Sequence, residues 1–130
     1  MTKANRVKVY EEHLKQEGYA PNVDDNGNIV FKSEGKVYII VLEDEDEAFF
    51  RLIFPNFWSI DSKRERTKVE SAALTSTERT KVAKVFTVGD NVWATVEMFV
   101  DSPDVVKPVF ARCMSALRTA VANFVVEMKK

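Results

Sequence analysis

The sequence predicts an α+β domain in which helices pack on a five-stranded antiparallel sheet. Helical patterns of apolar residues occur at both ends of the chain and in its middle, and β-branched and aromatic runs joined by short turns lie between them. The predicted order is therefore α-β-β-β-α-β-β-α. The 130 residues, of which 45% are hydrophobic and 30% charged, fit one globular domain over residues 1–130.

The first predicted helix covers residues 3–17. Thr2 can cap its first turn, and Gly18 can end it because glycine readily adopts the left-handed conformation found after helices. His13, the only histidine, falls on a polar part of the helix and is expected at the surface. One face of the helix is expected to carry Ala4, Val7, Tyr10, Glu11 and Leu14.

Three predicted strands follow, at residues 28–32, 37–42 and 49–54. The turn dipeptide Asn26-Gly27 precedes the first, and Pro55 is expected to end the third or to place it at a sheet edge. Short connections between successive strands predict an antiparallel meander. An acidic loop lies between the second and third strands and contains Glu43, Asp44, Glu45, Asp46 and Glu47.

The second half predicts a helix over residues 62–76, a hairpin of residues 80–88 and 91–100, and a long helix from residue 104 to about residue 128. Ser62 and Glu65 have the spacing of a capping box at the start of the middle helix. The apolar stripe of the last helix is wide enough to contact the sheet and something else, so it can be core within the chain throughout or form part of a dimer interface. Cys113 lies in this stripe, so burial is expected to raise the pKa of its thiol.

Several structural motifs accompany this order of elements. They are the helix end Glu17-Gly18-Tyr19, residues 25–31, the strands at residues 35–40 and 50–52, the second hairpin and the long last helix. In these motifs and in its order of elements, the chain resembles the YbjN-like family of bacterial proteins, whose fold is similar to that of the class I type III secretion chaperones. The resemblance covers nearly the whole chain. It implies an α+β fold and a non-enzymatic binding or chaperone-like module, often dimeric, in a family described as regulatory.

The composition argues against several classes of function. One cysteine and one histidine cannot form a disulfide or a His/Cys metal cluster, and the four scattered glycines form no phosphate-binding loop. A net charge of −1 gives no strong field toward nucleic acid or an anionic membrane, and no uncharged run approaches the ~20 residues of a membrane span. We therefore expect a cytoplasmic protein that is no enzyme and that has no cofactor, metal site, nucleic-acid partner or membrane contact.

Aromatic residues are the strongest candidates for a binding surface. Strand alternation places two of them on one face of the strand at residues 91–100, opposite its valines. They can form a partner surface unless the middle helix or a second subunit covers them. The predicted partner-binding residues are Phe57, Trp58, Trp93 and Phe99.

The sequence thus predicts a chaperone- or adaptor-like module that binds a protein partner, forms a homodimer and uses the acidic loop to orient the partner. The alternative is a regulator that responds to a small ligand or a metal through a pocket between the sheet and the C-terminal helix.

Overall fold

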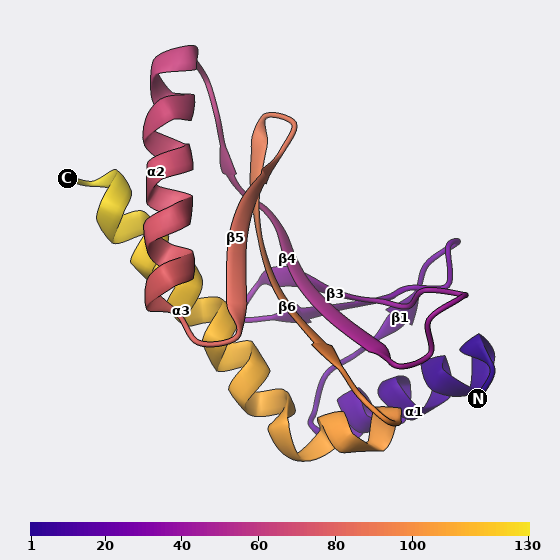
Figure 1. Cartoon of the computed structure of the whole chain (residues 1–130). Coiled ribbons are helices and arrows are strands. Elements are labelled where there is room, and N and C mark those ends of the chain that lie inside the picture. Colours follow the sequence, from indigo (N-terminus) through magenta and orange to yellow (C-terminus); the bar gives the residue numbers. More distant parts are fainter. The chain divides into compact units, whose positions relative to one another are not determined.

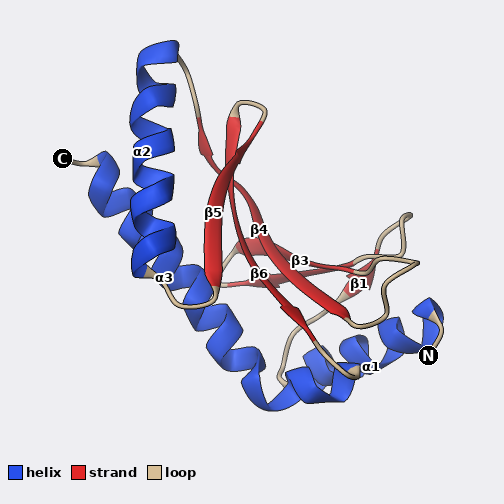
Figure 2. Ribbon diagram, in the orientation of Figure 1, coloured by secondary structure: helices blue, strands red, loops and turns tan.

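The computed structural model describes residues 1–130 and has the predicted α+β architecture (Figures 1 and 2). One antiparallel sheet has the strand order β1-β2-β3-β4-β6-β5. It contains six strands where five were predicted, because the two-residue strand β1 lacks the run of β-branched residues by which a strand is recognised. The elements are α1 (Lys3–Gln16), β1 (Asn22–Val23), β2 (Ile29–Ser33), β3 (Lys36–Val41), β4 (Phe49–Ser59), α2 (Lys63–Arg79), β5 (Ala83–Val88), β6 (Asn91–Phe99), the 3-10 helix η1 (Pro103–Val109) and α3 (Phe110–Met128).

The chain forms two compact units. The first contains Met1–Ile53 and Glu97–Phe110, and the second contains Phe54–Val96 and Ala111–Lys130. Strands β4 and β6 therefore contribute residues to both units.

The core of the first unit lies on one face of its strands. In the register, Phe31 pairs with Tyr38, and Ile40 pairs with Leu52, so alternate positions of β2, β3 and β4 share this face. Helix α1 packs there, with the ring of Tyr10 at 5.6 Å from the ring of Phe50. The face is aromatic and aliphatic and carries Ile29, Phe31, Tyr38, Ile40, Phe50 and Leu52, all of them buried.

The buried stripe of α1 differs from the predicted one. The prediction of a surface position for His13 is wrong: this residue is only 6% exposed, and its ring meets the ring of Phe110 edge-on at 5.3 Å. Ala4, placed on the inner face by prediction, is exposed. The reason is that η1, from far along the chain, contacts α1 and covers its polar flank. The buried residues of the helix are Arg6, Tyr10, His13 and Leu14.

In the second unit, α2 runs alongside the edge strand β5 (Figure 1). The hydroxyl of Thr77 accepts a hydrogen bond from the backbone N–H of Val85 at 2.8 Å and donates one to the carbonyl of Val85 at 3.3 Å. Unpaired backbone groups on an edge strand can otherwise template another strand. Helix α2 thus closes this edge of the sheet with a side chain.

Three element boundaries differ from the predictions, and two of the differences lie at a proline. Strand β4 continues past Pro55 to Ser59, since Asn56 takes a φ of 53° that asparagine tolerates better than most residues. The last helix was expected from residue 104, with its regular part starting there or just before Pro108; residues Pro103–Val109 form a 3-10 helix, and the α-helix begins at Phe110. Pro108 lacks an N–H group, and its ring disfavours a regular helix through the preceding residues. Helix α2 extends to Arg79, one turn beyond its predicted end.

The helical segment Pro103–Met128 contains an 18-residue window with a mean hydropathy of 1.3, and by length and composition alone the helix could cross a bilayer. The core helix of a globular domain meets the same criteria. The apolar side chains of α3 are in large part turned toward the protein, with Cys113, Met114, Leu117, Ala120 and Phe124 buried.

Replacing Thr77 with valine tests the role of α2 at the sheet edge. We expect the Thr77→Val protein to lose about 1–2 kcal/mol of unfolding free energy, because both backbone groups of Val85 lose their partner. Urea denaturation measures this loss. Thr67→Val is the control, since the hydroxyl of Thr67 bonds only to the Lys63 carbonyl of its own helix, and a change below about 0.5 kcal/mol is expected. Equal losses in the two variants would contradict the proposed closure of the edge.

Candidate functional site

Two of the four predicted binding aromatics lie against the core of the second unit. The rings of Phe57 and Trp58 both meet Phe124 edge-on, with centroids 5.4 Å away in each case. Phe57 also stacks on Phe54 at 5.6 Å. Both residues are half-buried, so much of their apolar area is used inside the unit.

Trp93 is also engaged within the second unit. Its indole Nε1 donates a hydrogen bond to Oδ1 of Asn56 at 2.9 Å, and its ring lies 6.5 Å from the ring of Phe86. Asn56 has a left-handed backbone, and its side chain is the one that fixes the indole.

Phe99 is the most exposed of the four. It lies at the end of β6 in the first unit, and 83% of its surface is accessible. Its ring is 6.0 Å from the ring of Phe49, the first residue of β4. Phe49 was absent from the predicted site, although the pair Phe49-Phe50 contained the signal: adjacent residues of a strand point to opposite faces, so only one of them can join the core.

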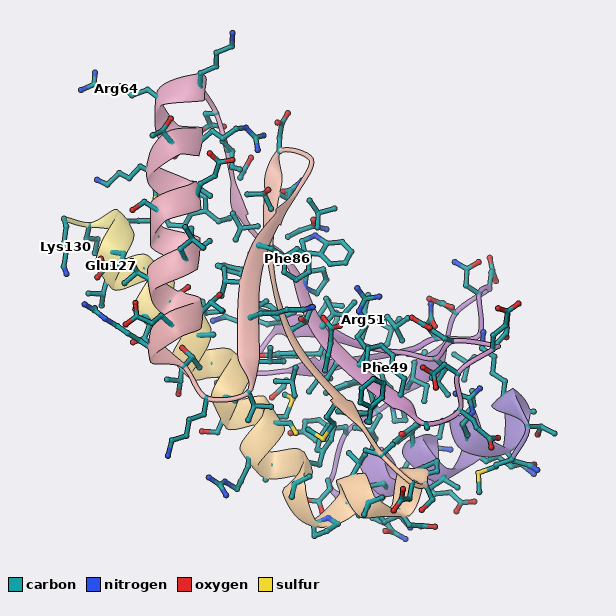
Figure 3. All side chains as sticks on the ribbon, viewed as in Figure 1. Phe49, Arg51, Arg64, Phe86, Glu127 and Lys130 are labelled. Carbon is teal, nitrogen blue, oxygen red and sulfur yellow. The ribbon has the colours of Figure 1, made fainter.

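Phe49 and Phe99 belong to an apolar surface of the first unit that we call the open face. In the register, Val30 pairs with Ile39 and Val41 pairs with Arg51, at positions that alternate with those of the core face under α1. Phe49 and Arg51 follow the same alternation on β4 and are marked in Figure 3. The residues of the open face are Val30, Val37, Ile39, Val41, Phe49 and Phe99, all exposed or half-buried.

One ion pair lies in this region. Nε of Arg51 is 3.8 Å from Oε2 of Glu97, and both side chains are partly shielded from solvent. It places a polar group of each sign among apolar residues.

The acidic loop lies between β3 and β4, next in sequence to Phe49. Helix α1 holds it: Nη2 of Arg6 donates a hydrogen bond to the carbonyl of Glu43 at 2.7 Å, and Nζ of Lys3 lies 3.1 Å from a carboxylate oxygen of Asp44. The amino group of Met1 donates to Oε2 of Glu47 at 2.7 Å, and this hydrogen bond and charge lower the pKa of the Glu47 carboxyl. Arg6 was not singled out from the sequence, because nothing local indicates that a charged residue of the first turns is buried.

The next question is whether side chains are placed for metal binding or for thiol chemistry. No group of three or more His, Cys, Asp or Glu side chains is placed to hold a metal ion. Cys113 is buried, as predicted, and burial raises the pKa of its thiol, while the nearby Arg112 opposes this shift more weakly. A thiol with a raised pKa holds its proton and is a poor nucleophile.

Comparison with known proteins identifies the fold and no more. No family model matches the chain, and no curated protein matches it. Among solved structures, an uncharacterized protein from Methanothermobacter thermautotrophicus is similar, with a TM-score of 0.57 and 17% sequence identity over 93% of this chain and 92% of that one.

Arg6 and Lys3 offer a matched test of how the acidic loop is held. We expect amide hydrogen exchange in residues 44–48 to rise about tenfold in Arg6→Met, because a buried hydrogen bond from a charged donor is lost. In Lys3→Met the rise should stay below about twofold, since an exposed ion pair contributes little. Mass spectrometry measures the exchange in both variants. Equal rises in Arg6→Met and Lys3→Met would contradict an anchoring role for Arg6.

Tyr10 allows a test of the core at alkaline pH. Burial raises the pKa of its phenol to about 12, and the charge of Arg6 opposes this more weakly. Because the folded-state pKa lies above the ordinary value of 10, the stabilisation is complete below pH 10 and is lost as the pH rises through 12.

We expect the difference in ultraviolet absorbance between the native protein and Tyr10→Phe to titrate near pH 12. The far-ultraviolet circular dichroism should report loss of structure over the same range. A difference that titrates near pH 10 would show that Tyr10 is accessible to solvent.

Proposed function

We propose that the protein is a non-enzymatic, cytoplasmic, protein-binding module of the chaperone or adaptor type, which binds a partner segment on the open face of the first unit. The observation that carries this proposal is the 83% exposure of Phe99 beside Phe49 at the end of two neighbouring strands. The resemblance to the YbjN-like family implies the same class of function.

Exposed aromatic residues support binding because they are costly on a free surface. Trp, Tyr and Phe supply large contact area, and interfaces draw most of their binding energy from a few such anchors. Val37, 38% exposed, extends the apolar surface along β3. Both sheet-edge and face binding use extended segments. The β5 edge is occupied by α2, and the opposite edge strand, β1, has only two residues, which favours the face.

Charge indicates the kind of partner. Of the five carboxylates in the acidic loop, those of Asp44 and Glu47 form ion pairs, and those of Glu43, Glu45 and Asp46 have no cationic partner. These three groups lie three to six residues before Phe49 in the sequence. We infer that the partner segment combines apolar side chains with lysine or arginine, because complementary charge sets orientation and association rate.

A second copy of the chain is the less favourable occupant of this face. A two-fold interface brings the same surface of both subunits together, so the acidic loops would approach each other. The homodimer expected from the sequence therefore calls for another surface, and Val126 of α3, 53% exposed, is a candidate for it.

A binding role also accommodates the two residues most suited to nucleophilic chemistry. Cys113 is buried in the second unit with its pKa raised, and His13 is buried in the first unit against Phe110. Each is thereby withdrawn from solvent and from a substrate.

Replacing Phe99 with serine tests the proposal. As a probe we would use a fluorescent peptide of about eight residues that alternates valine and lysine, with a valine–glutamate peptide for comparison. We expect saturable, salt-sensitive binding of the lysine peptide only, and a loss of affinity of about tenfold or more in Phe99→Ser. Fluorescence anisotropy measures both.

The matched control is Leu74→Ser. Leu74 is 75% exposed on α2, so the Leu74→Ser substitution removes a similarly exposed apolar side chain from a different surface. Less than about a twofold change is expected, as for residues outside an interface. Equal effects of the two variants, or binding of the glutamate peptide as well, would contradict the open face as the site.

The same pair of variants can be used to capture partners from a lysate. A protein retained by the native chain and by Leu74→Ser, but lost with Phe99→Ser, would identify the natural partner.

A further inference from the structure

A cleft in the second unit is lined only by basic, hydroxyl and small residues. Its volume is about 330 Å³, and it lies at the C-terminal end of α2, the connection to β5 and the first half of α3. Volumes of this size hold small ligands. The lining residues are Arg79, Thr80, Lys81, Arg112, Ser115, Ala116 and Thr119.

The absence of a carboxylate distinguishes this cleft from two others in the same unit. A second cleft of about 330 Å³ is lined by Arg64 and Lys68 but also by Glu65, and a smaller one of about 220 Å³ includes Asp61 and Asp90. Acidic side chains within a cleft neutralise its cations. Of these three clefts, the one at the end of α2 combines three cations with no acidic lining residue.

The cations of this cleft are largely uncommitted. Lys81 and Arg112 form no ion pair. Arg79 binds Glu127 through Nη1 at 3.2 Å, which leaves its other guanidinium donors available. The same carboxylate oxygen of Glu127 also pairs with Nζ of Lys130 at 2.8 Å. Figure 3 shows Glu127 and Lys130 near the C-terminal end of α3.

The cleft-lining residues of α3 form a single stripe along the helix. Arg112, Ser115, Ala116 and Thr119 are spaced i, i+3, i+4 and i+7, so they lie on the same side of the helix. Ala116 leaves room between the longer side chains. The hydroxyls of Ser115 and Thr119 can donate to an oxyanion that Arg112 binds by charge.

The connection before β5 positions the third cation. Val82 has a φ of 69°, a conformation that β-branched residues avoid, and its side chain is 63% exposed. Strained backbone of this kind persists where the surrounding structure imposes it. The backbone N–H of Ala83 donates a hydrogen bond to the carbonyl of Lys81 at 2.7 Å across this residue, and Lys81 lines the cleft.

We propose that this cleft binds a small phosphate-bearing molecule, with Arg112, Lys81 and Arg79 holding the phosphate and the hydroxyls of Ser115 and Thr119 donating hydrogen bonds to it. A doubly charged phosphate matches three cations better than a carboxylate does, and guanidinium groups pair with phosphate oxygens in a bidentate manner. The cleft shares no residue with the open face, and this proposal is independent of the proposed partner.

Pyrophosphate is the first probe. Isothermal titration calorimetry at constant ionic strength should give saturable one-to-one binding, tighter for pyrophosphate than for inorganic phosphate, and none for chloride. Arg112→Gln and Lys81→Gln should each raise the Kd for pyrophosphate about tenfold, as expected for the loss of a charge-assisted contact. Amide chemical shifts of Ser115 and Thr119 should move on titration.

Arg118→Gln is the matched control, because Arg118 is an exposed arginine on the same helix that does not line the cleft. Its effect on the Kd should stay below about twofold, since only screened, long-range attraction is removed. Equal effects of Arg112→Gln and Arg118→Gln, or binding that does not saturate, would overturn the proposal.

A single-stranded oligonucleotide provides the remaining comparison. If it bound more tightly than pyrophosphate and both arginine variants weakened it equally, the surface would be a nucleic-acid site, and the small-molecule proposal would be wrong.

Discussion

The two-residue period of the strands is the constraint on which the first unit depends. Adjacent residues of β4 must point to opposite faces, so only one of Phe49 and Phe50 can lie under α1. Phe50 does so, in contact with Tyr10, and Phe49 is left on the open face beside Phe99. A strand that is apolar at every position therefore creates an exposed apolar surface as a direct result of filling its core. The proposed binding face follows from this geometry.

The second unit differs from the first because a helix covers the edge of its sheet. Helix α2 covers the edge of β5 through Thr77, and its last residues also form one wall of the basic cleft. Contacts between α2 and α3 at Arg79 and Glu127, and between Asn123 and Thr80, hold this wall in place. One helix thus protects the sheet and shapes a candidate ligand site, while the proposed binding face of the first unit is built from strands alone.

Local signals in the sequence were sufficient for the fold class and for the starts of α1 and α2. Thr2 caps α1, and Ser62 caps α2, because a capping hydroxyl needs only the N–H three residues ahead. The burial of His13 and the anchoring by Arg6 depend on η1 and on the acidic loop, which are distant in sequence, and so were not predicted. The basic cleft also escaped prediction, because Lys81 and Arg112 meet only in the folded chain. Of the four predicted aromatics, Phe99 alone is strongly exposed, and a role for the others in partner binding stays a prediction.

The position of α2 in the chain has a consequence during synthesis. A ribosome releases α2 before β5, and only residues 80–82 separate the two elements. Helix α2, which covers the edge strand, has therefore already been synthesised when β5 emerges. The two elements are close in sequence, which favours rapid formation of their contact. A nascent chain that pauses before β6 already carries the hydroxyl that occupies the outward backbone groups of Val85. Neighbouring nascent chains on the same message then find that side of β5 already closed.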